Sequence, residues 1–318
     1  MKRHSGLFPQ IISFENIHSG YLKAGKGKRF KKDVLSFGYF LEYNLAGIKK
    51  ELEKENYVHG GYKEFIVRDS KKRTIRAPCF KDRIMHHALC NVVEPIFEKT
   101  FIFESYACRK RKGTHRALKR LRFWLKAAGG GYCLKCDISK YFDSVNQAVL
   151  LGTTEKKIKD KKAMRLLKEI AGSFNKETKT GIPIGNLTSQ LFANVFLNQM
   201  DQFIKRELKQ KHFIRYMDDF LILGEKKELR CLKEKIRDYL RSNLKLELHP
   251  KKADIFPSSK GVDFLGYVTF KNHVLLRKST VKRFLKKTRK IEGKERINSW
   301  LAYAKHADAF GLTKRLKL

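Results

Sequence analysis

Acidic residues, cysteine, proline and long apolar runs are all scarce in this chain. Its 318 residues include 32 Asp and Glu against 71 Lys and Arg, with only six cysteines and six prolines. The longest aliphatic or aromatic run is about four residues, as at Phe220–Leu223, whereas a membrane span needs roughly 20. No apolar signal core follows the basic start Met1–His4. The sequence therefore predicts neither a membrane-spanning helix nor secretion, and it predicts reduced thiols.

The apolar content is nevertheless sufficient for a folded core. Hydrophobic residues make up 42% of the chain and 23 of them are Phe, so a disordered basic tail is excluded. A formal net charge of +39 on a folded chain favours a polyanionic partner, and nucleic acid is the abundant one. The cations also cluster, with eight in Arg109–Arg122 and ten in Arg277–Arg296. The sequence therefore predicts nucleic-acid binding.

Hydrophobic spacing predicts a mixture of helices and strands without a regular βαβ repeat. Helical spacing extends over 34–56, and strand-like segments flank the basic turn Asp69–Lys72. Further hairpins are predicted over 212–223 and 262–276. Residues 1–33 are basic and punctuated by glycine, which is typical of an arm that orders only on a partner. The whole pattern predicts an α+β fold in which helices cover an antiparallel sheet.

The most specific feature is a pair of carboxylates inside an apolar frame. Asp218 and Asp219 follow Phe213–Met217 and precede Phe220–Leu223, so they lie at the turn of a hairpin. Taken alone, the pair also fits an ordinary exposed turn. If the frame is buried, two adjacent carboxylates repel each other unless a divalent cation neutralises them. Asp137 ends a second predicted strand, and magnesium prefers such oxygen ligands, so the sequence predicts a magnesium site.

Two motifs resemble those of the reverse transcriptase family, and they occur in the order expected there. Tyr216–Asp219 is similar to the signature box of the family, and Lys135–Asp143 is similar to the box that carries its first catalytic aspartate. The resemblance covers nearly the whole chain. It implies a right-hand polymerase fold and an RNA-directed DNA polymerase that adds deoxynucleotides to a primer 3′-end. It also implies two Mg²⁺ ions, for which Mn²⁺ is a possible substitute.

The resemblance implies domain boundaries as well. After the arm of residues 1–33, fingers are expected over 34–131, and a palm with the catalytic carboxylates is expected over 132–278. Fingers and palm interleave near 145–185. A short helical thumb is expected over 279–318.

The expected catalytic and metal-binding residues follow from the matched motifs. Asp137 and Asp218 are expected to hold both metals with support from Asp219. The backbone carbonyl of Ile138 is a further expected ligand. Lys252 lies where the family places a lysine that protonates the leaving pyrophosphate.

Several other residues are expected to contact the incoming nucleotide or the nucleic acid. Phe142 matches the aromatic residue that packs under the sugar and rejects a 2′-hydroxyl, which implies deoxynucleotides as substrates. Arg73 and Arg68 belong to a predicted fingers hairpin that grips the triphosphate, because guanidinium groups bond phosphate bidentately. The remaining expected nucleotide contacts are Ile184, Gly185 and Gln190, and the expected nucleic-acid contacts are Arg109, Lys112, Lys282, Arg283 and Lys286.

The stretch Gly181–Gln190 resembles one branch of the family, the reverse transcriptases of diversity-generating retroelements. Most reverse transcriptases carry Gln and Pro where this chain has Ile184 and Gln190. Tyr106–His115 and His86–Leu89 are similar to the same branch. The branch implies a cytoplasmic enzyme, encoded by bacteria or phage, that copies a template-repeat RNA into cDNA with errors opposite adenine. It also implies a small basic accessory protein, an accessory variability determinant, as a partner.

Two alternatives stay open. One is a retron, CRISPR-associated or defence reverse transcriptase, which would have the same polymerase activity in a different biological setting. The other is a non-catalytic maturase-like RNA-binding protein, which would have the polymerase fold without the activity. The intact Asp137, Asp218 and Asp219 count against the second alternative, since a pure binder has no need of negative charge beside phosphates. The expected partners of the polymerase are template RNA, a DNA or RNA primer, cDNA and deoxynucleoside triphosphates, with no membrane.

Overall fold

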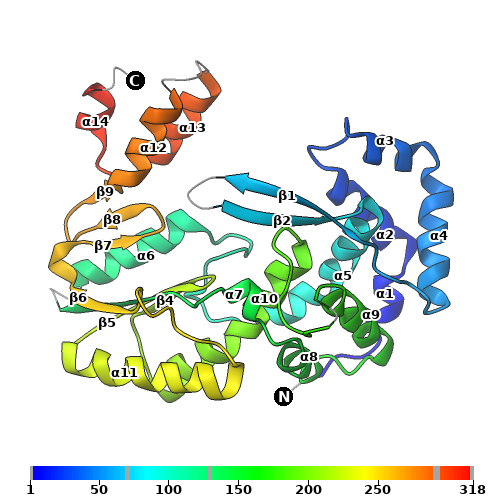
Figure 1. The fold of residues 1–318 in the computed structure, drawn as a ribbon, viewed down its shortest axis with the longest axis horizontal. Coiled ribbons are helices and arrows are strands. Elements are labelled where there is room, and N and C mark those ends of the chain that lie inside the picture. The colour runs from blue at the N-terminus through cyan, green and yellow to red at the C-terminus, as the bar shows by residue number, and fades with distance from the viewer. Residues whose placement is uncertain (1–2, 69–71, 128–130, 176, 289–293, 316–318) are drawn as a thin grey trace. The chain divides into compact units, whose positions relative to one another are not determined.

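The computed structural model of the protein describes residues 3–68, 72–127, 131–175, 177–288 and 294–315. The chain divides into two units, and Figure 1 gives the labels of their elements. The first unit consists of residues 1–102, 138–203 and 238–247, and the second of residues 103–137, 204–237 and 248–318. Within the described ranges, no helix has both the length and the apolar character that crossing a membrane requires.

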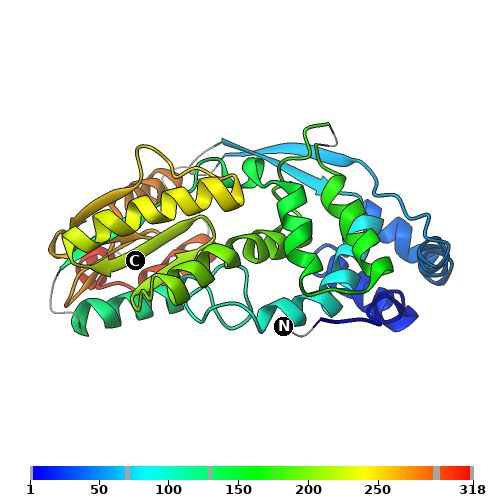
Figure 2. The same ribbon diagram turned by 90° about the horizontal axis from the view of Figure 1, so that it is seen from below.

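The first unit is mainly helical and carries one two-stranded hairpin. Helix α2 packs along α5, with Ile17 of α2 and Ile84 of α5 fully buried. The antiparallel hairpin β1–β2 extends from the helices of this unit as a long ribbon (Figure 2), and its predicted turn at 69–71 lies outside the described residues. The elements are α1 (Phe8–Ile11), α2 (Phe14–Gly25), α3 (Lys32–Tyr39), α4 (Leu41–Glu53), β1 (Tyr62–Arg68), β2 (Lys72–Pro78), α5 (Phe80–Glu98), α7 (Tyr141–Ser144), α8 (Gln147–Glu155), α9 (Lys161–Gly172), α10 (Leu187–Gln202) and a π-helical turn (Leu240–Leu244).

The prediction of an N-terminal arm that orders only on a partner is wrong for residues 3–25. They fold as the helices α1 and α2, and Ile17 is fully buried. One carboxylate fastens them, because Oδ2 of Asp160 accepts hydrogen bonds from the backbone nitrogens of Leu7 and Phe8 at 2.7 and 2.9 Å. Its other oxygen caps the first turn of α9. Most of the basic residues of the predicted arm lie after residue 25, and the segment before them forms amphipathic helices whose apolar faces belong to the core of the unit.

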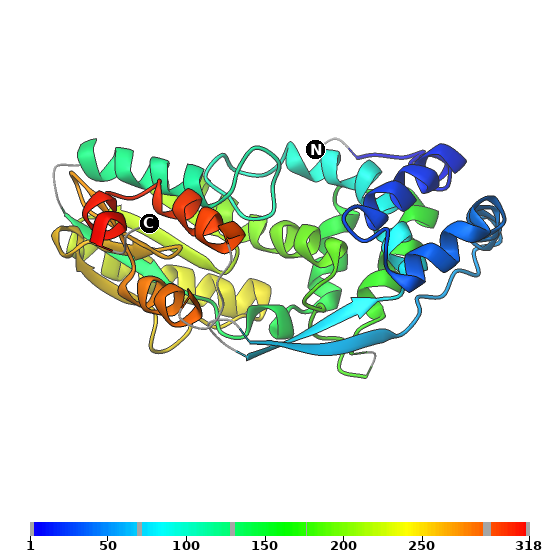
Figure 3. The same cartoon turned by 90° about the horizontal axis from the view of Figure 1, so that it is seen from above.

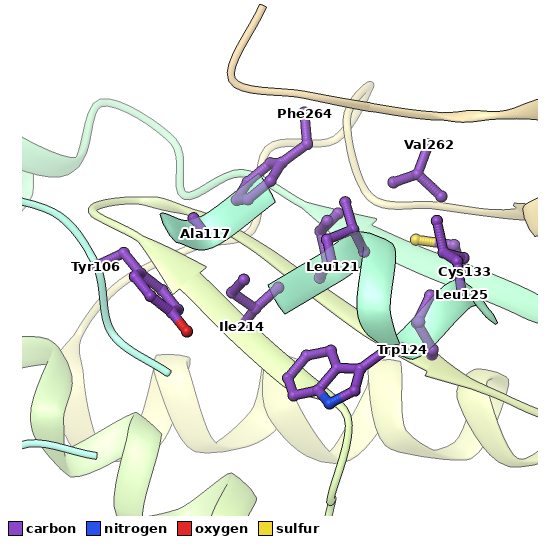
Figure 4. Packing of buried hydrophobic residues seen from close by; sticks show 11 residues of the cluster. Tyr106, Ala117, Leu121, Trp124, Leu125, Cys133, Ile214, Val262 and Phe264 are labelled. Atoms are coloured by element: carbon purple, nitrogen blue, oxygen red, sulfur yellow. The ribbon is translucent and has the colours of Figure 1, made fainter. Parts of the chain in front are cut away.

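The second unit contains two antiparallel sheets with a helix between them. The four-stranded sheet has the order β4-β5-β3-β6, and the three-stranded sheet has the order β7-β8-β9. Helix α6 lies between the sheets, where Leu121 packs with Cys133 and Ile214 of the first sheet and Phe264 of the second (Figure 4). Helix α11 lies along the strands of the four-stranded sheet (Figure 2). The elements are α6 (Thr114–Ala127), β3 (Tyr132–Cys136), a π-helical turn (Phe203–Glu207), β4 (Phe213–Tyr216), β5 (Asp219–Gly224), α11 (Lys226–Tyr239), β6 (Asp254–Pro257), a 3₁₀ turn (Ser258–Lys260), β7 (Val262–Phe264), β8 (Tyr267–Thr269) and β9 (Val274–Leu276).

Three further helices complete the second unit beside its three-stranded sheet (Figure 3). They are α12 (Lys278–Thr288), α13 (Lys294–Ala304) and α14 (Phe310–Arg315). Phe284 of α12 stacks on Trp300 of α13 with ring centroids 4.2 Å apart, and both pack in one buried cluster with Tyr267 of β8. Antiparallel sheets covered by helices confirm the predicted α+β class.

Candidate active site

Three aspartates gather at one end of the four-stranded sheet. Strands β4 and β5 form a hairpin whose two-residue turn is Met217 and Asp218, and Asp219 begins β5. Strand β3 pairs with β5 in a register that places Asp137, the residue after β3, beside Asp219. Ile138, the expected carbonyl ligand, directly follows Asp137 and has a buried side chain. Local strand pairing thus brings the three carboxylates together.

We call the sheet end that carries Asp137, Asp218 and Asp219 the carboxylate edge. Burial makes the ionised forms of Asp218 and Asp219 costly. Burial, followed by the neighbouring carboxylates of Asp219 and Asp137, raises the pKa of Asp218 to about 6. Burial also raises the pKa of Asp219. A divalent cation would relieve this repulsion, and carboxylate oxygens are the ligands that magnesium prefers, so the three residues fit the expected metal. In the part of the chain that the structure describes, no group of three or more His, Cys, Asp or Glu side chains already has the arrangement of a metal site.

Lys252 forms an ion pair with one of these carboxylates. Its Nζ lies 2.6 Å from Oδ2 of Asp137. The backbone explains this placement, because the His249 nitrogen donates to the carbonyl oxygen of Asp137 at 2.8 Å and the Lys252 nitrogen donates to that of His249 at 3.1 Å. The lysine that the sequence singles out is therefore located at the carboxylate edge and partly neutralises it.

Arg215 is a member of this site that the sequence analysis missed. Its side chain is fully buried, and its guanidinium donates to the carbonyl oxygen of Met217 at 3.1 Å and to the hydroxyl of Ser105 at 3.0 Å. Met217 has a φ of 59°, in the left-handed region that is strained for a residue with a side chain. The guanidinium therefore holds the turn that presents Asp218. The available signal was a charged residue two positions after the buried Phe213, on the same face of an apolar strand.

A second group of the expected site residues lies in the first unit, where the loop 181–186 meets the hairpin β1–β2. The backbone nitrogen of Arg76 in β2 donates to the carbonyl oxygen of Ile184 at 2.9 Å. The backbone nitrogen of Ile182 donates to the carbonyl oxygen of Phe142 at 2.8 Å. The loop therefore joins β2 to the segment that carries Phe142, and both Ile184 and Phe142 are partly exposed.

Gly185 allows the loop to approach the hairpin closely. It has a φ of +120°, and a Cβ there would lie 2.8 Å from Cγ2 of Ile75 and 3.1 Å from the carbonyl oxygen of Arg76. We expect Gly185→Ala to lower the free energy of unfolding by about 1 to 3 kcal/mol, as measured by urea denaturation. Gly47→Ala in helix α4 is the matched control, because its Cβ would meet nothing within 4 Å. That control should stabilise the protein by up to about 1 kcal/mol, and equal losses in both variants would contradict the expectation.

The two arginines expected to bind phosphate lie on opposite faces of the hairpin. Arg68 pairs with Lys72, the neighbour of Arg73, so the side chains of Arg68 and Arg73 point to opposite sides. Ile75 shares the face of Arg73, and this is the face against which Gly185 packs. Arg73 is therefore on the side of the loop 181–186, and Arg68 is on the other side.

Two residues expected to contact nucleic acid make contacts within the second unit. NH1 of Arg109 donates to the carbonyl oxygen of Ser105 at 2.7 Å. Nζ of Lys112 donates to the carbonyl oxygen of Phe103 at 2.7 Å and lies 3.3 Å from the centroid of its ring. Both cations thus order the loop that precedes α6. Of the other expected contacts, Lys282, Lys286 and Gln190 are exposed and Arg283 is partly buried.

The fold is that of right-hand polymerases. Apo telomerase from Candida tropicalis, truncated from its C-terminal domain, matches with a TM-score of 0.52 and 17% sequence identity, over 68% of this chain and 55% of that chain. Telomerase from Candida albicans in complex with a fragment of telomeric RNA matches with a TM-score of 0.51 and 12% identity, over 71% of this chain and 48% of that chain. These matches confirm the fold that the motifs implied.

Residues 55–269 match the family described as reverse transcriptase (RNA-dependent DNA polymerase), and the chain belongs to that family. Protein YkfC of Escherichia coli strain K12 is 27% identical over 276 residues, which cover 71% of this chain and 72% of that protein. The group II intron-encoded protein LtrA of Lactococcus lactis subsp. cremoris is 24% identical over 328 aligned positions, which cover 80% of this chain and 54% of LtrA. The chain therefore spans about half the length of LtrA and of the telomerase structures.

Proposed function

We propose that the protein is a magnesium-dependent RNA-directed DNA polymerase that extends a primer on an RNA template. The observation that carries this proposal is the convergence of Asp137, Asp218 and Asp219 at one sheet end in a chain of the reverse transcriptase family. Burial and the carboxylate neighbours raise the pKa of Asp218 to about 6, and a bound cation would offset this cost of its negative charge. Two magnesium ions held by these residues and the carbonyl of Ile138 would activate the primer 3′-hydroxyl and neutralise the triphosphate and the leaving pyrophosphate.

The side chains of the protein would hold the substrate and move one proton. Nζ of Lys252, held 2.6 Å from Asp137, carries the proton that the pyrophosphate would receive. Arg73, on the hairpin face beside the loop 181–186, would bind the triphosphate bidentately. In the same proposal the helices after residue 279 form a thumb whose exposed Lys282 and Lys286 contact the phosphates of the duplex.

Phe142 provides a test of the proposed deoxynucleotide selectivity. Its partly exposed ring would pack under the sugar and exclude a 2′-hydroxyl. We expect Phe142→Ala to lower the ratio of kcat/KM for deoxynucleotides to that for ribonucleotides by about 10- to 100-fold, as measured by single-nucleotide primer extension. The value of kcat/KM for deoxynucleotides should change much less than the ratio. An unchanged ratio would remove Phe142 from the nucleotide site.

We further propose that this polymerase makes adenine-mutagenised cDNA from a template-repeat RNA of a diversity-generating retroelement, together with a small basic accessory protein. The sequence of the stretch 181–190 supports this branch. Ile184 is partly exposed on a loop that is bonded to β2, and its aliphatic side chain cannot supply the hydrogen bond that a glutamine there would make. Loss of that polar contact would weaken the alignment of template and nucleotide.

The role of Ile184 in fidelity leads to a direct prediction. Ile184→Gln is expected to lower misincorporation opposite template adenine by about tenfold, because a restored hydrogen bond is worth about 1 kcal/mol or more. The measurement is primer extension on a defined RNA template followed by sequencing of the cDNA. Ile184→Val keeps an aliphatic side chain and should keep the error spectrum. An identical spectrum in wild type and I184Q would refute this role.

A second candidate is a non-catalytic maturase-like RNA-binding protein, and the similarity to a group II intron-encoded protein and to a nuclear intron maturase supports it. Magnesium-dependent extension of a primer on RNA separates the candidates. RNA binding without extension, even with accessory protein and native RNA, would favour the binder. Extension that is accurate opposite adenine would favour a retron, CRISPR-associated or defence reverse transcriptase.

A further inference from the structure

A cluster of polar side chains, four of them buried and one partly exposed, lies beneath the hairpin β1–β2, and none of them has a role in the proposal above. We call it the hairpin anchor, and its members are His59, Tyr62, Asp82, His86 and Asn186. His59 and Tyr62 come from the root of β1, Asp82 and His86 from α5, and Asn186 directly precedes α10. Asp82 and His86 are each 1% exposed and Asn186 is 2% exposed. Buried polar groups of this kind specify one arrangement of the elements that they join.

Asp82 ties together the two ends of the hairpin. Its Oδ1 accepts a hydrogen bond from the hydroxyl of Tyr57 at 2.7 Å, and its Oδ2 accepts one from the backbone nitrogen of Gly60 at 2.9 Å. The thiol of Cys79, the residue after β2, donates to the same Oδ2 at 3.1 Å. A Cβ on Gly60 would lie 2.9 Å from Oδ2, so a larger residue there would displace the carboxylate. The carboxylate therefore fixes the segment before β1 and the segment after β2 in one arrangement.

His59 and His86 are joined by a hydrogen bond between their rings. Nδ1 of His59 lies 2.6 Å from the carbonyl oxygen of Gly60, so that nitrogen carries a proton and donates. Nε2 of His59 lies 3.2 Å from Nε2 of His86, within hydrogen-bond distance, and Oδ2 of Asp82 lies 3.6 Å from Nδ1 of His59. Burial lowers the pKa of His86 to about 3, which keeps this ring neutral. His86 thus orients the ring of His59 and, through it, the root of β1.

Tyr62 connects the histidines to the loop 181–186. Its hydroxyl oxygen lies 2.5 Å from the hydroxyl of Ser173, 3.5 Å from Nε2 of His59 and 3.4 Å from Nδ2 of Asn186. Asn186 is the last residue of the loop, which is also bonded to β2 through its backbone. The hairpin and the loop are therefore both bonded to the hairpin anchor, through Tyr62 and Asn186, and they are bonded to each other through Arg76 and Ile184.

We propose that the hairpin anchor holds the hairpin β1–β2 and the loop 181–186 as one rigid body, and that His86 is a positioning residue for the incoming nucleotide. The loop carries Ile184, and the hairpin face beside it carries Arg73. A rigid connection sets the separation of these two side chains before a nucleotide binds, which lowers the cost of binding it. His86 acts through His59. The kinetic part of this inference rests on the proposed polymerase function.

Substitution of His86 tests the kinetic part. His86→Leu removes the ring that bonds Nε2 of His59 at 3.2 Å and leaves that nitrogen only the longer contact to the Tyr62 hydroxyl at 3.5 Å, so we expect the KM for deoxynucleotides to rise about tenfold while kcat stays within about threefold. His86→Gln retains a polar side chain that can donate or accept this hydrogen bond, and it is expected to restore most of the wild-type KM. His87→Leu, next to it on α5, is the control and should leave KM unchanged. Equal effects of H86L and H86Q, or a loss confined to kcat, would overturn the positioning role.

Hydrogen exchange tests the rigid-body part without any activity. The amide of Arg76 donates to the carbonyl oxygen of Ile184 in the loop, and the amide of Ile182 in the loop donates to the carbonyl oxygen of Phe142. The exchange of both amides is expected to be about tenfold faster in H86L than in wild type or H86Q. The amides of β3 in the second unit serve as an internal reference. Unchanged exchange at Arg76 in H86L would overturn the proposal. If wild type fails to extend primers while exchange responds as expected, the polymerase function and the nucleotide role fail and the rigid body stands.

Discussion

Asp218→Asn is expected to reduce magnesium-dependent primer extension about a thousandfold. The amide cannot supply the anionic oxygen that magnesium prefers, and Asp218 occupies the turn between the two strands that carry the carboxylate edge. The measurement is extension of a labelled primer on a defined RNA template at saturating deoxynucleotides and magnesium. Full activity in this variant would refute the proposed catalytic site.

The same substitution is expected to stabilise the protein when no divalent cation is present. The folded pKa of Asp218 is about 6, above the usual 3.8, so above pH 6 the folded state bears the cost of a charged, buried carboxylate that the unfolded chain does not bear. This cost shrinks as the pH falls through 6 and is nearly gone at 4. We expect D218N to raise the free energy of unfolding by about 1 to 3 kcal/mol at pH 7.5 in EDTA, with a much smaller gain near pH 4.

Asp238→Asn is the matched control for both effects. Asp238 is exposed on α11, and its replacement removes the same charge from the chain. It should change neither primer extension nor the free energy of unfolding by a measurable amount. A D218N protein that loses stability together with activity would indicate that Asp218 supports the turn and has no specific role in binding metal.

Arg215→Met is expected to lower the free energy of unfolding by about 3 kcal/mol and to abolish most primer extension. Methionine fills much of the same volume but donates no hydrogen bond, so the carbonyl of Met217 and the hydroxyl of Ser105 lose the donor that they have in the folded state. The strained φ at Met217 then has one restraint fewer, and the turn that presents Asp218 relaxes. Urea denaturation and primer extension of the same preparation measure the two effects.

Arg230→Met controls for the loss of an arginine as such. Arg230 is exposed on α11, and its replacement should change the free energy of unfolding by no more than about 0.5 kcal/mol. If R215M is as stable and active as R230M, the backbone alone holds the turn, and Arg215 is not part of the site.

The carboxylate edge could be predicted because local pattern determines it. Apolar residues over 213–223 and 132–136 require buried strands, and a hairpin with two central carboxylates places them at a sheet end. Arg215 could not be assigned in the same way, because an arginine in a strand usually reaches solvent. Its partner Ser105 lies 110 residues away in the sequence. Only tertiary structure brings that hydroxyl to the strand.

The N-terminal helices and the placement of the two hairpin arginines also escaped prediction. The composition of residues 1–33 was a poor guide because most of their Lys and Arg lie after residue 25, whereas α2 contains a single lysine, Lys23, and buries Ile17 in the core. For Arg68 and Arg73, the side to which each points depends on the register of β1 and β2. Charge and proximity in sequence identified both arginines but could not tell their faces apart.

The double role of Asp160 has a practical consequence for producing the protein. The same side chain accepts hydrogen bonds from the backbone at the start of the N-terminal helices and caps α9, so one residue holds both segments. Removal of residues 1–25 would uncover the apolar side of α5 that α2 covers. The shortened protein would expose an apolar surface that favours aggregation, so purification should retain the first helices and screen the charge of the chain with salt.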